Sequence, residues 1–217
     1  MSESRSRSQF EHSSKSIMEN NLEKPGRPKF ERFLIEKIEN LPIRDLDKVD
    51  LILLLAGRKK AVDINVPREG NEWQDNLHEL GLYFVEAEDL RNDKKRKFYV
   101  AKSQDDAEKL SKAFKEHDDI EAGILSGYPL SAVENYSNTT KELHRPDMKE
   151  SEVIDLLRSR YVEYVDLPPE SKVEELRPFI HFGLSAKNWE EELGVVREWA
   201  ETIKNQDPEL YSRLFKK

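Results

Sequence analysis

The stretch Gly-Tyr-Pro-Leu-Ser-Ala-Val, residues 127–133, predicts a sharp break between two helices. Gly127 can adopt the left-handed conformation that ends one helix, and Pro129 has the fixed φ that suits the first turn of the next. Because turn chemistry alone explains this glycine and proline, we favour the interpretation that Tyr128 packs in the core. The alternative is a pocket at the break, with Tyr128 as a hydroxyl donor and Ser131 in the first helical turn.

The residues before this break predict a mixture of helices and short strands. Apolar residues spaced three and four apart indicate helices, whereas alternation of apolar and polar residues indicates half-buried strands. These patterns predict helices over about 30–38, 45–56, 73–80 and 103–114, and strands over about 62–66, 82–85 and 97–101. The charged segment 86–96 is predicted to connect the last two strands as a hairpin.

The residues after the break are predicted to be mostly helical. We expect a helix from residue 130, an exposed loop over 137–149, a further helix near 153–157, and a short extended segment over 161–167. Residues 179–182 are expected to be extended and to lead to a long helix capped by Ser185. Asp207 and Pro208 form an N-cap with proline in the first turn, which predicts a final short helix.

This order of elements predicts an α+β fold in a single domain over residues 29–217. We expect a small mixed β-sheet of about three to four strands, several packed helices and a helix-rich C-terminal half. The elements do not alternate as repeated βαβ units, so the pattern does not favour a doubly wound nucleotide-binding sheet. Residues 1–28 are polar and nearly free of aliphatic side chains, which predicts a disordered tail.

The composition narrows the classes of function. A formal net charge of −8 argues against nonspecific nucleic-acid binding by the whole chain, because phosphate affinity depends on clustered Lys and Arg. The chain has no cysteine, which excludes disulfides, thiolate zinc sites, iron–sulfur clusters and a cysteine nucleophile. No apolar run approaches the roughly 18–20 residues that a membrane span needs, and the polar N-terminus does not resemble a signal peptide. We therefore expect a cytoplasmic protein with no membrane partner.

The N-terminal segment Lys-Pro-Gly-Arg-Pro-Lys, residues 24–29, is a candidate for nucleic-acid contact. Its Gly-Arg-Pro core resembles the hooks with which extended arginines enter the minor groove of DNA. Lys24, Arg27 and Lys29 supply the cations, but acidic residues precede them. A solvated linker is therefore the favoured interpretation, and a nucleic-acid partner that binds this tail is the alternative.

Residues 117–121, His-Asp-Asp-Ile-Glu, gather nitrogen and oxygen atoms that could ligate a metal. His117 and Glu121 would share a face if one helix ran through the segment. The same residues also form a natural helix end followed by an aspartate cap for the next helix. Capping is the favoured interpretation.

The segment His-Phe-Gly-Leu-Ser, residues 181–185, precedes the long amphipathic helix. A phosphate or carboxylate could bind near His181 and Ser185, since free N–H groups at a helix start attract anions. Against this, the acidic residues 190–192 crowd the following turn and would compete as the negative partners. Because buried polar groups usually find structural partners, a structural role for His181 is favoured.

Together, the segments 127–132 and 181–188 resemble an uncharacterised archaeal family, the domain of unknown function 483. Its members carry a Gly-Tyr-Pro-x-Cys-Cys motif and, later, a His-x-Pro-Cys-Ser-x-x-Cys motif. In this chain Ser131 and Ala132 stand at the first cysteine pair, and Leu184 and Asn188 stand at the later two positions, within a resemblance that spans about residues 30–215.

The family's paired cysteines would suit metal capture or redox work. Serine and alanine cannot supply a soft ligand, so the resemblance implies that this chain holds no metal or redox cofactor. It also implies that the two helix starts are neighbours, because cysteines that act together must converge on one site. We expect Ala132 and Leu184 to fill the former site with apolar atoms.

The sequence therefore predicts a non-catalytic binding or scaffold protein that has lost a cysteine-based site, with a protein as a candidate partner. One alternative is an enzyme with a metal-free polar site. Its candidate residues are Tyr128, Ser131, His181 and Ser185. The other alternative is a nucleic-acid accessory protein that acts through the basic N-terminal tail.

Overall fold

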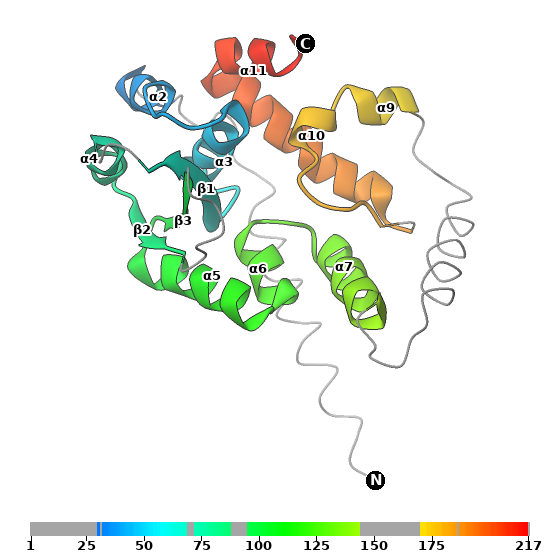
Figure 1. Cartoon of the computed structure of the whole chain (residues 1–217). Coiled ribbons are helices and arrows are strands. Elements are labelled where there is room, and N and C mark those ends of the chain that lie inside the picture. Colours follow the sequence, from blue (N-terminus) through cyan, green and yellow to red (C-terminus); the bar gives the residue numbers. More distant parts are fainter. Residues whose placement is uncertain are drawn as a thin grey trace. The chain divides into compact units, whose positions relative to one another are not determined.

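The computed structural model describes residues 30, 32–68, 72–87, 95–143, 170–185 and 187–216. The described residues after Phe30 belong to one compact unit, Glu31–Lys217. Its helices, shown in Figure 1, are α2 (Arg32–Glu39), α3 (Asp45–Leu55), α4 (Glu72–Glu79), α5 (Gln104–Glu116), α6 (Asp119–Leu125), α7 (Leu130–Leu143), α9 (Glu170–Glu174), the short 3-10 helix η1 (Arg177–Phe179), α10 (Trp189–Gln206) and α11 (Pro208–Leu214). The predicted tail 1–28 and the segments 153–157 and 161–167 lie outside the described residues.

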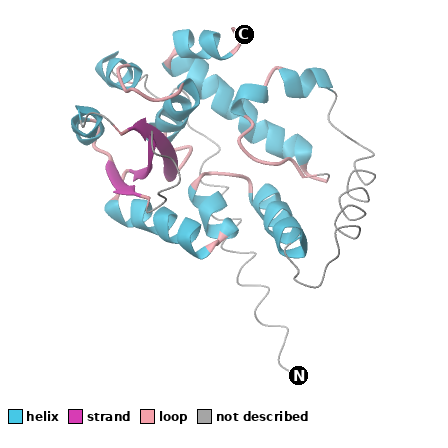
Figure 2. Cartoon of the chain, in the orientation of Figure 1, coloured by secondary structure: helices cyan, strands magenta, loops and turns pink. Residues whose placement is uncertain are grey.

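Three strands, β1 (Ala61–Pro67), β2 (Tyr83–Glu86) and β3 (Lys95–Ala101), form one sheet in the order β1-β3-β2 (Figure 2). Ala101 at the end of β3 pairs with Ala61 of β1 on one side and with Tyr83 of β2 on the other. Both pairings are antiparallel, so within the described residues the sheet is not mixed as predicted. The α+β class itself is confirmed.

The two faces of the sheet carry side chains of different size, because successive residues of a strand point to opposite sides. One face holds the packed rings of Trp73, Phe84 and Phe98, whose centroids are 4.5–5.8 Å apart. The other face packs on α5 and α6 through a cluster of mostly small side chains, Ala61, Tyr99, Ala101, Ala107, Leu110, Ala113, Ala122 and Leu125. Small side chains let these helices approach the strands closely.

Helix α3 lies at the centre of the unit and contacts β1, α2, α10 and α11. Residues 51–54, Leu-Ile-Leu-Leu, are wholly buried. Full burial of each such side chain stabilises the fold by about 1.5–3 kcal/mol, so this one turn anchors the core. Helix α10 crosses α3 and brings the C-terminal part of the chain to the same core (Figure 1).

The predicted break at residues 127–129 is confirmed. Helix α6 ends at Leu125, Gly127 has a φ of 74°, and α7 begins at Leu130. The backbone N–H of Lys60 donates to the Leu125 carbonyl at 2.9 Å, which ties the end of α6 to the loop after α3. A Cβ atom at residue 127 would collide with the backbone carbonyl of Arg58, so the close approach itself requires glycine.

Three predicted boundaries are wrong. Helix α7 continues through Leu143, although an exposed loop was predicted from residue 137; residues 144–149 lie outside the described ranges. Ser137 is buried, so packing of this turn outweighs the weak helix propensity of its polar residues. Part of the predicted extended segment 179–182 is the end of η1. Helix α10 begins at Trp189, four residues after the predicted cap.

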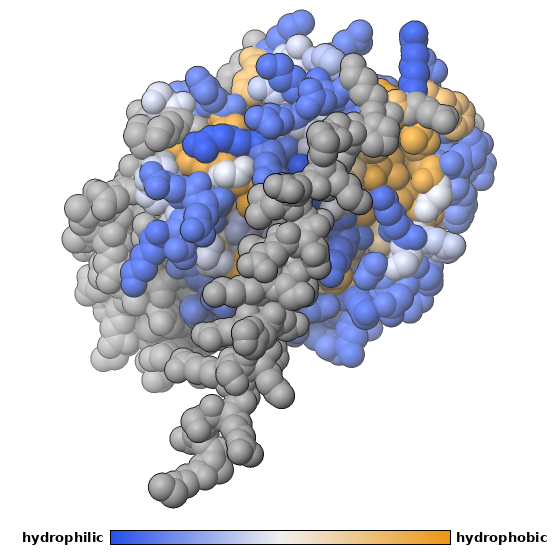
Figure 3. Space-filling view, turned by 180° about the vertical axis from the view of Figure 1, so that it is seen from behind, coloured by the Kyte–Doolittle hydropathy of each residue, from blue (hydrophilic) through white to orange (hydrophobic). Residues whose placement is uncertain are grey.

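Polar side chains cover most of the coloured surface seen from behind, with hydrophobic areas between them (Figure 3). This distribution agrees with a composition in which 37% of the residues are charged. Within the described part of the chain, no helix is both long enough and apolar enough to cross a membrane.

Candidate functional site

The helix start after the Gly-Tyr-Pro break and the segment before α10 meet at one buried carboxylate. The Ser131 hydroxyl donates to Glu192 Oε1 at 2.6 Å, and the Ser185 backbone N–H donates to Glu192 Oε2 at 2.6 Å. Glu192 is fully buried in the first turn of α10. We call these three residues the Glu192 bridge. Because one carboxylate binds both partners, the two predicted segments are direct neighbours.

The contact between the two segments is polar, whereas packing by Ala132 and Leu184 was expected to fill it. Ala132 is buried and Leu184 is half-buried, but the link itself passes through Glu192. A buried carboxylate needs hydrogen-bond donors, and Ser131 and the N–H of Ser185 provide them. The Ser185 hydroxyl accepts from the Asn188 N–H at 3.1 Å, so it caps the turn that leads into α10.

A second cluster, in which Lys59 is buried and Asp50 and His181 are half-buried, joins α3, the loop after it and the segment 180–183. Asp50 Oδ1 lies 2.7 Å from Lys59 Nζ and 3.1 Å from His181 Nδ1. His181 Nε2 lies 3.1 Å from the Pro178 carbonyl, so each ring nitrogen faces an acceptor within the protein. We call Asp50, Lys59 and His181 the Asp50 cluster. Protonated at both nitrogens, the ring can donate to both acceptors at once.

Charge compensation holds Asp50 in its ionised form. Burial by itself would raise the pKa of Asp50, but the ammonium of Lys59 and the hydrogen bond and charge of His181 outweigh burial. The net result is a pKa below the ordinary value of 3.8. The Lys59 ammonium also lies 4.7 Å from the ring centroid of Trp199 and 5.3 Å from that of Tyr128, which adds cation–π attraction.

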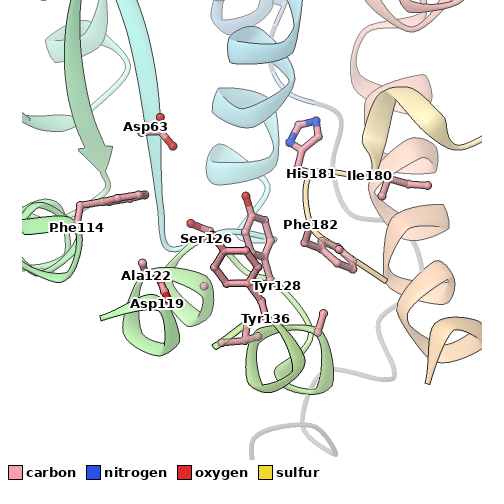
Figure 4. A pocket seen from close by; sticks show the side chains of 14 residues that line it. Asp63, Phe114, Asp119, Ala122, Ser126, Tyr128, Tyr136, Ile180, His181 and Phe182 are labelled. Carbon is pink, nitrogen blue, oxygen red and sulfur yellow. The ribbon is translucent and has the colours of Figure 1, made fainter. Parts of the chain in front are cut away.

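A pocket of about 520 Å³ lies beside these clusters and is partly open to solvent. Aromatic, small apolar and acidic side chains form its walls: Asp63, Phe114, Asp119, Ala122, Gly123, Ser126, Tyr128, Ala132, Val133, Tyr136, Ile180, His181, Phe182 and Gly183. In Figure 4, Tyr128 stands in the middle, Asp63 and Phe114 lie on one side, and His181 and Phe182 on the other. A concave site with apolar walls and a few polar groups is typical of small-molecule binding.

The acidic side of the pocket contains two carboxylates in different surroundings. Asp63 on β1 lies 3.1 Å from the ammonium of Lys97, so its charge is compensated. Asp119 is half-buried at the first position of α6, and no cation pairs with it among the residues that the structure describes. The ring of Phe114 lies at the same side (Figure 4).

Tyr128 is a neutral wall residue. Burial raises the pKa of its phenol well above the ordinary value of 10.0, and the charges of Asp50 and Asp63 raise it further. Its ring packs 5.3 Å from that of Phe182 and 6.2 Å from that of Trp199. An aromatic side chain held this way offers a surface for packing and a hydroxyl proton, but no anion near neutral pH.

The four residues predicted as a single pocket are divided between two places. Tyr128 and His181 line the pocket, whereas Ser131 and Ser185 belong to the Glu192 bridge and are not among the lining residues. The segment 117–121 has the cap role that was favoured for it, since the Asp118 side chain accepts from the Glu121 N–H at 3.1 Å.

Sequence reasoning missed three groups of this region, Asp50, Lys59 and Asp63. Asp119 was named only within the segment 117–121, and Glu192 only among the acidic residues 190–192 that were expected to compete near Ser185. A signal for one of them existed, because Asp50 directly precedes the apolar run 51–55 in a helix that was predicted to bury one face. The basic residues 58–60 follow the end of this helix, where cations favour the helix dipole, yet the ammonium of Lys59 lies against Asp50. Asp63 carries no local pattern that separates it from a surface acid.

Lys24, Arg27 and Lys29 lie outside the described residues. Within the described ranges, no group of three or more His, Asp or Glu side chains is arranged to hold a metal ion.

Comparisons with known proteins give no assignment: no family model, no curated protein and no solved structure matches this chain. The resemblance to the domain of unknown function 483 family therefore stays a prediction.

Proposed function

We propose that this chain is a non-catalytic binding protein whose pocket takes a small organic ligand. The observation that supports this most strongly is a contrast between two sets of side chains at the site: those that are hydrogen-bonded or ion-paired within the protein, and those that face the pocket. The side chains with catalytic potential bind one another inside the protein, and the pocket retains mostly surfaces for contact. Tyr128, Phe182 and Phe114 supply apolar area, and Asp119 supplies a polar group that can fix orientation.

The engaged groups argue against an enzyme of the predicted kind. A catalytic base must reach the proton that it removes from the substrate. The nitrogens of His181 face Asp50 and the Pro178 carbonyl, and the hydroxyl of Ser131 donates to Glu192 away from the pocket lining. The Ser131–Glu192 contact is the one feature that favours a hydrolase. Reaction of Ser131 with a fluorophosphonate would support that alternative and contradict the proposal.

The proposal includes no metal or redox cofactor. The four positions that carry cysteine in the resembling family are Ser131, Ala132, Leu184 and Asn188 in this chain, and none offers a thiolate. Elemental analysis after purification without chelators is expected to find no stoichiometric zinc or iron. One metal per chain would contradict this part of the proposal.

A neutral aromatic compound tests the pocket itself. We expect 2-phenylethanol to bind the full chain saturably in calorimetric or NMR titration, because its ring matches the aromatic walls. Tyr136 lines the pocket but is 55% exposed, so Tyr136→Ala removes one wall with little loss of packing. An aromatic contact is worth about 0.5–1.5 kcal/mol, which predicts an affinity about 2- to 10-fold weaker.

The matched control is Tyr83→Ala on β2, a similarly exposed tyrosine that does not line the pocket. Its affinity for 2-phenylethanol should equal that of the unaltered chain. Equal losses in both variants, or no saturable binding to the unaltered chain, would refute the proposed function.

A further inference from the structure

We infer that the pocket takes a small organic cation, with its ammonium group between Asp119 and Phe114 and its apolar or aromatic body against Tyr128. This inference rests on the proposed function, because it assigns the ligand class of the same pocket. It depends on three features of the walls: an open carboxylate, aromatic faces beside it, and a histidine that is already engaged.

The first feature is the charge on the acidic side of the pocket. The acidic and imidazole side chains that line the pocket are Asp63, Asp119 and His181. Lys97 compensates Asp63, and Asp50 faces His181, so each of these has an internal partner. Asp119 is left with no cation among the described residues, and its half-buried position keeps it less screened than a surface acid. A ligand cation would compensate this charge.

The second feature is the aromatic surroundings of that charge. The ammonium of Lys97 lies 3.1 Å from Asp63 and 5.4 Å from the ring centroid of Phe114. The protein therefore already places one ammonium between a carboxylate and this ring. Asp119 and Phe114 line the same side of the pocket, and Tyr136 lines it as well (Figure 4). Aromatic faces attract cations, so the same combination would hold a ligand ammonium.

The third feature excludes an anionic ligand group on the opposite side. His181 is the cationic candidate there, beside Ile180 and Phe182. Its Nδ1 faces Asp50 and its Nε2 faces the Pro178 carbonyl, both at 3.1 Å. Neither N–H points free into the pocket, so a ligand carboxylate or phosphate would find no donor from this ring. The far side therefore suits an apolar body.

Three compounds of similar shape test the charge preference: 2-phenylethylammonium, 2-phenylethanol and 3-phenylpropanoate. We expect the ammonium compound to bind the full chain about fivefold more tightly than the alcohol, the effect of one partly screened charge contact, and the carboxylate to bind most weakly. Added salt should reduce the difference between the ammonium compound and the alcohol.

Two aspartate variants locate the charge. Asp119→Asn should weaken binding of 2-phenylethylammonium about fivefold and leave binding of 2-phenylethanol unchanged. Asp105→Asn is the matched control, since Asp105 also lies in the first turn of a helix, is exposed, and does not line the pocket. Lys97→Met should strengthen binding of the ammonium compound, because it frees Asp63.

The outcomes separate the two proposals. If the alcohol binds as tightly as the ammonium compound, or if Asp119→Asn weakens both equally, the cation assignment is wrong and the binding pocket stands. If the carboxylate binds best, the charge assignment is also wrong. If none of the three compounds binds, the proposed function fails and the cation assignment fails with it.

Discussion

The Asp50 cluster and the acidic side of the pocket contain the same kinds of groups in opposite arrangements. In the cluster, Asp50 has two partners, and the ammonium of one of them, Lys59, lies over the rings of Trp199 and Tyr128. In the pocket, Asp119 and Phe114 both line the wall, and Asp119 has no ion-pair partner in the described ranges. One carboxylate therefore holds the fold together, and we propose that the other binds a ligand.

The comparison teaches that the polar groups of the Asp50 cluster and the Glu192 bridge are not by themselves a functional site. Asp50 and Glu192 meet the requirement that a buried charge be paired or hydrogen-bonded. These contacts inside the protein occupy both carboxylates. Function is expected where the same residue types remain unsatisfied beside a cavity. Replacing a carboxylate that has partners inside the protein should thus reduce the free energy of unfolding. Replacing one that has no partner beside the pocket should instead reduce the affinity for a ligand.

The largest effect is expected from breaking the Asp50 cluster. Asp50→Asn leaves the ammonium of Lys59, which is 1% exposed, without its carboxylate. Removal of one partner from a buried ion pair costs about 3–5 kcal/mol of unfolding free energy. The control is Glu198→Gln, which breaks the Arg58–Glu198 pair at the surface and should cost at most about 1 kcal/mol. Denaturant unfolding measures both losses, and equal losses would contradict the larger contribution expected from the Asp50–Lys59 pair.

Replacing the glycine at the break tests whether close packing joins the two regions. Gly127→Ala forces a side chain into a left-handed position and into the carbonyl of Arg58, and we expect a loss of about 1–3 kcal/mol. Gly57→Ala has a similar φ of 70° but open space around the added Cβ. It should therefore cost only the conformational part, about 1 kcal/mol. A smaller loss at residue 127 than at residue 57 would contradict the contact.

Two substitutions of Glu192 test the Glu192 bridge, one that removes both hydrogen bonds and one that can keep them. Glu192→Leu leaves the buried N–H of Ser185 without an acceptor, and an unsatisfied group of this kind costs about 1–3 kcal/mol. Glu192→Gln should cost less, because an amide can accept from Ser185 and donate to the hydroxyl of Ser131. Glu190→Gln, in the same turn but exposed, should change stability by at most about 0.5 kcal/mol. If Glu192→Gln is the worst of the three, the bridge is not held as described.

The pH dependence of stability follows from the lowered pKa of Asp50. A carboxyl whose pKa is lower in the folded state stabilises the fold above its unfolded value of 3.8 and loses this contribution as pH falls through the folded value. The unaltered chain should therefore lose stability below pH 3.8 more steeply than Asp50→Asn, which has no such group. Unfolding free energies measured across this range give both slopes. Parallel slopes would contradict the pairing of Asp50.

The phenol of Tyr128 gives a smaller effect at alkaline pH. Its raised pKa means that folding favours the neutral form, so its contribution is complete below the ordinary value of 10.0 and declines as pH rises above it. Spectroscopic titration of the folded chain should show a tyrosine step above the ordinary value of 10.0, and we assign this late step to Tyr128. Tyr128→Phe should remove that late step, and a late step that persists in this variant would assign it to another residue.

Local chemistry predicted the outline of the fold. The cap at Asp207 and the left-handed glycine at residue 127 involve residues at most a few positions apart, and the structure contains both. The contact between Ser131 and Glu192 joins residues 61 positions apart, so no periodicity or spacing announces it. For the same reason the pocket escaped prediction, since β1, α5, α6, α7 and the segment 180–183 each supply part of its lining.

Helix α3 shows a different limit of sequence reasoning. Its boundaries were predicted well, but one buried face was expected, and the structure buries residues 47–49 and 51–54 around most of the helix. Leu46 has the apolar spacing of this helix, since Val49 and Leu53 follow it by three and seven residues, yet it is 40% exposed. Periodicity identifies a helix that has one partner, whereas α3 contacts four other elements. This wide burial leaves Asp50 half-buried at the edge of the core.

One measurement tests the separation of stability and binding most directly: denaturant unfolding of the unaltered chain, Tyr136→Ala and Glu192→Leu, each with and without saturating 2-phenylethanol. A ligand that binds only the folded state raises the unfolding free energy by an amount set by its affinity. We predict that Tyr136→Ala keeps its stability without ligand and loses part of the increment, and that Glu192→Leu loses stability without ligand and keeps the increment. An increment of zero in the unaltered chain, or a parallel loss of both quantities in Glu192→Leu, would contradict the account.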